Sequence, residues 1–108
     1  MRSLFVACAL LVAMGNAGAD TNAATELARK QYKAGEAEFT LGRYAVALEH
    51  FNDAYARAPF PDLLFDIGRC HEELGHYKEA IAAYERFTIV APNQSERVHD
   101  RIVALAGC

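Results

Sequence analysis

The sequence predicts an all-α protein in which two helix-turn-helix units stack and a further helix covers one end. The first observation is an internal repeat, because Leu41-Gly42-Arg43-Tyr44 recurs as Leu74-Gly75-His76-Tyr77, 33 residues later. An offset in this range is typical of stacked repeats. The second observation is that apolar residues after each motif recur at steps of three and one, as on one face of a helix. The third is that Gly and Pro stand where such helices would end.

The first nineteen residues have the three-part layout of a secretory signal peptide. Arg2 precedes an apolar run over residues 4–14, and Ala17-Gly18-Ala19 forms a small-x-small cleavage site. The run is too short to span a bilayer, which takes about 20 apolar residues. We therefore assign residues 1–19 to a signal peptide and expect an exported chain with no transmembrane segment after cleavage. A buried N-terminal helix is the alternative interpretation.

Composition indicates one folded domain without a nucleic-acid-binding surface. The chain has 108 residues, of which 53% are hydrophobic and 23% charged, and its formal net charge is −3. Such a chain can bury a modest core. A nucleic-acid groove would need a strongly basic surface, which this balance does not supply.

The first repeat is expected over residues 28–60, after a lead-in over residues 20–27. Thr21 or Asn22, in the lead-in, is a suitable N-cap for the first helix. Good helix formers then predict a helix over residues 25–41, which Gly42 should end in the left-handed conformation. A second, amphipathic helix follows over residues 44–58. The connection between the two helices is so short that they must be antiparallel neighbours.

The second repeat is expected over residues 61–94. Pro59-Phe60-Pro61 stops the preceding helix, since a residue before proline is pushed out of the α region. Asp62 is the expected N-cap of a third helix that runs to about Leu74. The fourth helix, over residues 77–91, carries the same apolar steps as the second.

Residues 95–108 are expected to form a capping helix. Asn93 and Glu96 have the spacing of a capping box, so the helix should begin near Gln94 and run to Ala106. One apolar stripe beside several charges suits a terminal helix that covers an open end. The residues expected to face inward are Val98, Ile102, Leu105 and Ala106.

These residues together resemble the tetratricopeptide repeat, a helix-turn-helix unit of about 34 residues. The resemblance covers residues 28–93 and implies a short right-handed α-solenoid of two repeats with a capping helix. Small residues are needed where helices approach closely, and large ones fill the spaces between them. The chain departs from the pattern at Phe87, a large residue where the first repeat has Ala54. The positions expected to be structural are Gly35, Gly42, Tyr44, Ala47, Phe51, Pro59, Gly68, Gly75, Tyr77, Ala80, Tyr84 and Pro92.

The resemblance also implies a binding site, because in this family the first helix of each repeat lines a concave groove for peptides or partner helices. The candidate groove residues are Tyr32, Glu36, Phe39, Thr40, Phe65, Arg69, Glu72 and Glu73. Aromatic side chains beside charges make a suitable recognition surface. A solvated helix face is the alternative interpretation. Tyr32 and Glu36 stand where the carboxylate-clamping members of the family have Lys and Asn, so that specificity is not expected.

Two cysteines remain after signal cleavage, Cys70 and Cys108. If the capping helix runs parallel to the third helix, both thiols fall near the same end, and a disulfide could staple the cap to the repeat. Two free thiols, one of them buried, are the alternative.

Neither a metal site nor a catalytic site is expected. No two of the four histidines, His50, His71, His76 and His99, are four residues apart, and no Cys-x-x-Cys accompanies them. The sequence contains no recognisable buried acid–base pair, phosphate loop or Ser-His-Asp order. We therefore expect no cofactor and no enzymatic activity.

The predicted function is non-catalytic binding of a protein or peptide in a bacterial periplasm or cell envelope. The alternative is a structural role, in which the open end of the array stacks on a second copy or on a larger envelope assembly. An enzyme or a metal-binding protein is the least expected outcome. The residues at which the two repeats differ, such as Phe39 against Glu72, are the expected place for specificity.

Overall fold

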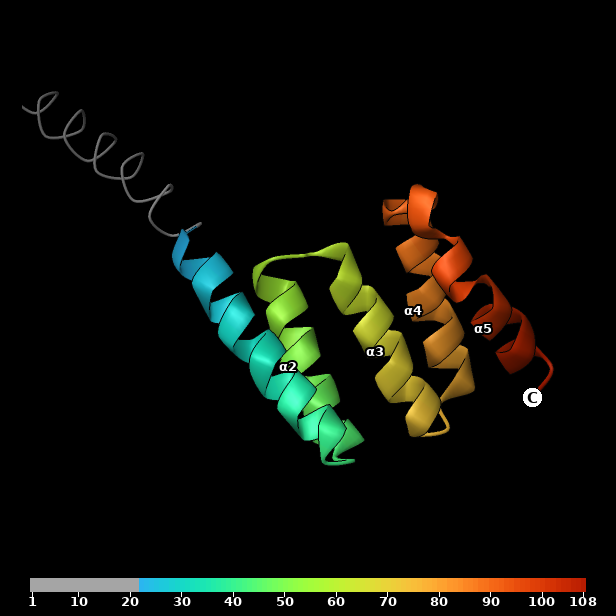
Figure 1. The fold of residues 1–108 in the computed structure, drawn as a ribbon, viewed down its shortest axis with the longest axis horizontal. Helices are drawn as coiled ribbons and strands as arrows, with labels where there is room; N and C mark the ends of the chain where they lie inside the picture. Colours follow the sequence, from blue (N-terminus) through green and yellow to red (C-terminus); the bar gives the residue numbers. More distant parts are fainter. Residues whose placement is uncertain (1–21) are drawn as a thin grey trace, which may run out of the picture.

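The computed structural model describes residues 22–108, which form α-helices, a short 3-10 helix and no strand (Figure 1). The prediction of an all-α protein is therefore confirmed. The signal peptide assigned to residues 1–19, and residues 20 and 21 of the lead-in, lie outside the described residues. No helix within residues 22–108 is long and apolar enough to cross a membrane. The first helix covers residues 22–40, and it is followed by α2 (Tyr44–Arg57), α3 (Pro61–Glu73), α4 (Tyr77–Val90), η1 (Pro92–Gln94) and α5 (Glu96–Ala106).

The helices lie side by side in chain order and alternate in direction (Figure 1). Each helix-turn-helix pair therefore stacks on the next, and α5 covers the far side of α4. α3 packs against both α2 and α4, so it joins the two repeats. This is the arrangement of a short helical solenoid.

The two inter-helix turns have the same backbone structure. Gly42 and Gly75 both have a φ of 79°, which is the left-handed conformation predicted for them. In the first turn, the N–H of Arg43 donates to the carbonyl of Glu38 over 2.9 Å, and that of Gly42 donates to Phe39 over 2.9 Å. The second turn has both bonds at the equivalent residues. Each turn thus satisfies two of the carbonyls that a helix end leaves unpaired.

The first helix and α3 begin differently from the prediction. α3 begins at Pro61 and has Phe60 as its N-cap, so Asp62 lies in the first turn instead of capping the helix. Proline suits the first helical position because its missing N–H would be unpaired there anyway. Asn22 is helical and is not an N-cap, and Thr21 lies outside the described residues.

The expected capping box of the last helix is also wrong. Pro92, Asn93 and Gln94 form the 3-10 helix η1, and α5 begins after Ser95 with no side-chain cap bond. The fixed φ of Pro92 favours this tighter turn directly after α4. Ala106, which was expected to face inward, is exposed in the last turn of α5.

The core consists of two clusters, one on each side of α3. The first lies between the two repeats and contains Ala28, Ala47, Phe51, Ala54, Ala58, Leu63, Ile67, Cys70 and Ala83. The second joins α3 and α4 to α5 and contains Leu64, Ala80, Tyr84, Phe87, Ala91, Val98 and Leu105. Phe87, the large residue that departs from the repeat pattern, is fully buried in the second cluster and forms much of the contact with α5.

Two helical glycines allow aromatic rings to lie against the backbone. A Cβ built on Gly35 would lie 2.7 Å from Cε1 of Phe51, and one on Gly68 would lie 2.6 Å from Cδ1 of Tyr84. Such distances are too short for carbon–carbon contact, so the close approach expected at both glycines is present.

Tyr77 does not have the packing role expected of it. Tyr44 is half-buried and lies edge-on to Phe39, with ring centroids 5.0 Å apart. Tyr77 is 42% exposed, because the residue equivalent to Phe39 in the second repeat is Glu72, which offers no ring to pack against.

The two cysteines are free, so the disulfide considered from the sequence is not formed. Cys70 is buried in the first cluster, whose members come from the first four helices and not from α5. Burial raises the pKa of its thiol to about 12, which keeps it protonated and unreactive. Cys108 is exposed at the end of the chain, where its thiol lies 3.6 Å from the carbonyl oxygen of Ala104.

Candidate functional site

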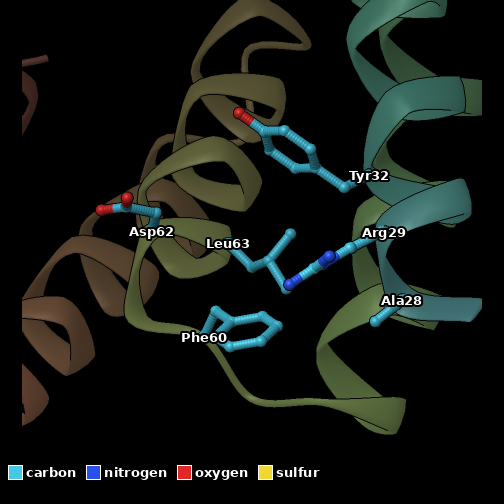
Figure 2. Close-up of a pocket in the computed structure, with 6 residues that line it drawn as sticks. All are labelled: Ala28, Arg29, Tyr32, Phe60, Asp62 and Leu63. Carbon is cyan, nitrogen blue, oxygen red and sulfur yellow. The ribbon is translucent and has the colours of Figure 1, made fainter. Parts of the chain in front are cut away.

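A first cavity lies between the first helix and the start of α3 (Figure 2). Its volume is about 260 Å³. Arg29 and Tyr32 reach from the first helix toward α3, where Leu63 and Phe60 lie opposite them (Figure 2). The carboxylate of Asp62 points away from these side chains. The cavity thus presents mainly apolar walls with one guanidinium and one phenol. Its lining residues are Ala28, Arg29, Tyr32, Phe60, Asp62 and Leu63.

A second cavity lies farther along the same two helices and has a volume of about 150 Å³. Four of the predicted groove residues line it: Glu36, Phe39, Thr40 and Arg69. The remaining lining residues are Phe51 and Asp66. Because both cavities lie between the first helix and α3, we call them together the groove.

Tyr32 connects the two cavities. Its hydroxyl donates to Oε1 of Glu36 over 2.8 Å, and its ring lies 6.0 Å from the ring of Phe51, measured between centroids. The hydrogen bond to Glu36, together with burial, raises the pKa of the Tyr32 phenol to about 12. The phenol is therefore neutral and donates to the carboxylate at all physiological pH values.

Asp66 is the most perturbed carboxyl group of the groove. Burial raises its pKa from 3.8 to about 6, and the charges of Glu36 and Asp62 add to this effect. Arg69 lowers the pKa, but its Nη1 lies 4.0 Å from Oδ1 of Asp66, at the outer limit of an ion pair. Asp66 is thus a partly compensated carboxylate that would gain from a further positive charge.

Arg69 links the two repeats across the groove. Its Cζ lies 4.3 Å from the centroid of the Phe39 ring, in cation–π geometry. Such a contact contributes about 0.5–1 kcal/mol at an exposed site. Phe39 comes from the first helix and Arg69 from α3, so this pair connects the two walls of the second cavity.

The other predicted groove residues lie outside the two cavities. Phe65 and Glu72 face α5, where Arg101 donates from Nη1 to Oε2 of Glu72 over 2.6 Å. The Tyr84 hydroxyl also donates to this oxygen, over 3.3 Å. Cζ of Arg101 lies 5.6 Å from the centroid of the Phe65 ring. These contacts anchor the capping helix, and Glu73 is exposed and lines neither cavity.

Sequence reasoning missed several residues of this face. Asp66 could have been found from its spacing, because it lies three residues before Arg69 and therefore on the same face of α3. Arg97 and Arg101 are four residues apart on α5 and are among the charges that lie beside its apolar stripe in the sequence. Arg97 instead donates to Oδ1 of Asp62 over 3.0 Å and lies 4.6 Å from the Phe65 ring centroid. Phe60, Leu63 and Arg29 gave no signal in the sequence.

We expect Asp66→Asn to stabilise the protein at pH 7.5 by about 1 kcal/mol, after allowance for the lost Arg69 contact and for solvent screening. The folded pKa, about 6, lies above the unfolded value of 3.8. The contribution of this carboxyl to stability is therefore full below about pH 4 and is lost as the pH rises through 6. The advantage of the variant should shrink as the pH falls toward 4. Urea denaturation at both pH values measures it.

Asp53→Asn on the exposed face of α2 controls for the change in net charge. A difference between Asp66→Asn and the parent that grows on acidification would contradict the assignment of a raised pKa.

A family model described as tetratricopeptide repeat matches residues 32–95, which is more than half of the chain. The match covers both inter-helix turns, the second cavity and α3. No curated protein matches the chain.

Proposed function

The chain belongs to the tetratricopeptide repeat family, and we propose that it is a non-catalytic scaffold of the bacterial periplasm or cell envelope that binds a peptide segment of a protein partner in its groove. Tetratricopeptide domains are generally protein-interaction scaffolds. Support for export comes from the signal-peptide layout of residues 1–19. The observation that carries the binding proposal is the second cavity, where two carboxylates, an arginine and two aromatic rings converge.

The charges of the second cavity favour a cationic side chain of the partner. Two carboxylates, Glu36 and Asp66, face a single guanidinium, that of Arg69. Glu36 accepts a hydrogen bond from the neutral Tyr32, and the ion pair of Asp66 with Arg69 is long, at 4.0 Å, with a weaker contribution from the charge of Arg97. A lysine or arginine side chain of the ligand would supply the missing positive charge.

The first cavity favours an apolar side chain beside that cation. Its walls include Ala28, Phe60 and Leu63, and Phe60 is 47% exposed. An exposed ring next to a cavity loses water-accessible apolar surface when a ligand covers it, which favours binding. The proposed ligand is therefore a segment in which an apolar residue and a basic residue follow one another along the groove.

We expect the purified protein to bind peptides that carry a basic and an apolar residue more tightly than the same peptides with glutamate in place of the basic residue. Fluorescence anisotropy with a panel of labelled synthetic peptides measures this preference. Glu36→Lys should lower the affinity for the tightest-binding peptide at least about ten-fold, because like charges at an interface cost several kcal/mol. Glu49→Lys, an equal charge reversal on the exposed face of α2, should leave affinity unchanged.

Two results would contradict the proposal. Equal affinity for basic and acidic peptides would contradict the claim that the groove prefers a basic ligand residue. Equal loss of affinity in Glu36→Lys and Glu49→Lys would show that net charge acts and that the groove is not the site.

A further inference from the structure

The turns that end the first helix and α3 bring two side chains together at equivalent positions. In the second turn, the N–H of His76 donates to the carbonyl of His71 over 2.8 Å, and that of Gly75 donates to Glu72 over 3.1 Å. This pair of bonds is the Schellman motif, in which the side chains at C3 and C″ commonly touch. His71 occupies C3 and His76 occupies C″, so the backbone holds the two imidazoles beside each other.

The same positions of the first repeat contain an ion pair. Glu38 and Arg43 are the residues 33 positions before His71 and His76. Nη1 of Arg43 lies 3.6 Å from Oε2 of Glu38. The first turn therefore contains two groups of opposite charge that complement each other.

The second turn contains two groups of the same kind. Nδ1 of His71 lies 3.3 Å from Nδ1 of His76. Two imidazoles can complement each other only when one nitrogen carries a proton and the other does not, or when both nitrogens bind the same cation. The bond lengths of a tetrahedral zinc site, about 2.0–2.1 Å to each histidine nitrogen, place two such nitrogens about 3.3–3.4 Å apart. The observed separation thus matches that of two ligands of one metal ion, as well as that of a hydrogen bond between one protonated and one unprotonated nitrogen.

We propose that His71 and His76 together bind one divalent transition-metal ion of the Zn²⁺ type at the C-terminal end of α3. The ion would sit between the two Nδ1 atoms, with water completing its coordination. Imidazole nitrogens are suitable ligands for zinc and its neighbours in the first transition row.

Two features of the surroundings favour a cation here. The dipole of α3 gives its C-terminal end a partial negative charge. His76 also lines an open cavity of about 460 Å³ together with Glu79 and Cys108, which leaves space for water around an ion.

The proposed site has two protein ligands, so the protein alone does not complete the coordination of the ion. Within residues 22–108 no group of three or more His, Cys, Asp or Glu side chains is placed to hold an ion. Two histidines that are five residues apart do not face the same side of a helix, so this spacing is not a recognised helical metal motif. His71 and His76 come together because the chain turns at Gly75 and places His76 beyond the end of α3.

Isothermal titration of the purified protein with zinc chloride at pH 7.5 tests the proposal, and one Zn²⁺ per chain is expected. His71→Ala and His76→Ala should each weaken binding at least about ten-fold, since the second ligand then no longer acts intramolecularly. The double variant His71→Glu with His76→Arg, which installs the residues of the first turn, should abolish it. No binding by the parent, or equal binding by this double variant, would overturn the proposal.

A variant that should gain a second zinc site provides an independent test. Glu38→His with Arg43→His places the same pair in the first turn and should raise the stoichiometry to two Zn²⁺ per chain. His99→Ala, at an exposed site on α5, and Cys108→Ser should each leave both stoichiometry and affinity unchanged. Loss of zinc binding in Cys108→Ser alone would assign the ion to the terminal thiol. Circular dichroism checks that each variant is folded.

Discussion

Replacing Phe87 by alanine is expected to lower the free energy of unfolding by about 3–5 kcal/mol. The Phe87 side chain is fully buried, and its ring centroid lies 6.1 Å from that of Phe65. Arg97 of α5 covers the same ring, with its Cζ 5.2 Å from the centroid. The change would remove apolar contact area and leave a cavity between α4 and the capping helix. Urea or guanidinium denaturation followed by circular dichroism measures the loss.

The position of Phe87 also determines which part of the molecule should loosen first. Val98 and Leu105 of α5 belong to the same buried cluster, so amide hydrogen exchange in α5 should accelerate more than exchange in α2. Ile89→Ala on the same helix is the matched control, because Ile89 is 76% exposed. That substitution should change stability by no more than about 0.5 kcal/mol. Similar effects of the two substitutions would contradict the assigned role of Phe87.

Gly68→Ala is expected to destabilise the protein by about 1–3 kcal/mol, although alanine is the better helix former. The added Cβ would meet three atoms of the Tyr84 ring, two of them at 2.6 and 2.8 Å. Tyr84 is fully buried, and its hydroxyl is bonded to Glu72, so the ring has little freedom to move aside. Thermal or chemical denaturation of the variant measures the cost of this overpacking.

Gly107→Ala supplies the control for the substitution itself. A Cβ there would have only the carbonyl oxygen of Ala104 nearby, at 3.6 Å, which is ordinary contact. This variant should be neutral or slightly stabilising, since alanine restricts the unfolded chain more than glycine does. Stabilisation by Gly68→Ala of similar size would show that α3 and α4 can separate without cost.

The groove was only partly predictable because its residues come from two helices whose rotation depends on packing. Glu36, Phe39 and Thr40, which the repeat pattern predicts to face the groove, line the second cavity. Phe65 and Glu72 were expected there too, but α5 covers them. The sequence of a terminal helix does not reveal which residues of its neighbour it will bury.

The order of the α-helices, the two glycine turns and the small residues at close contacts could be predicted from the amino-acid sequence alone. These features follow from local rules, namely helical periodicity, the left-handed φ that glycine adopts at low cost, and the repetition of both at one offset. They are properties of short segments, so they can be recognised before any segment is placed.

Tertiary packing determines the electrostatic environment of the groove. Asp66 acquires its raised pKa from burial between two helices. Such desolvation depends on elements distant in sequence, and no local pattern encodes it. The pairs His71–His76 and Glu38–Arg43 have a different origin, because the glycine turns that the sequence predicts bring their side chains together. Of the two proposed sites, the groove is therefore a product of packing and the histidine pair a product of a local turn.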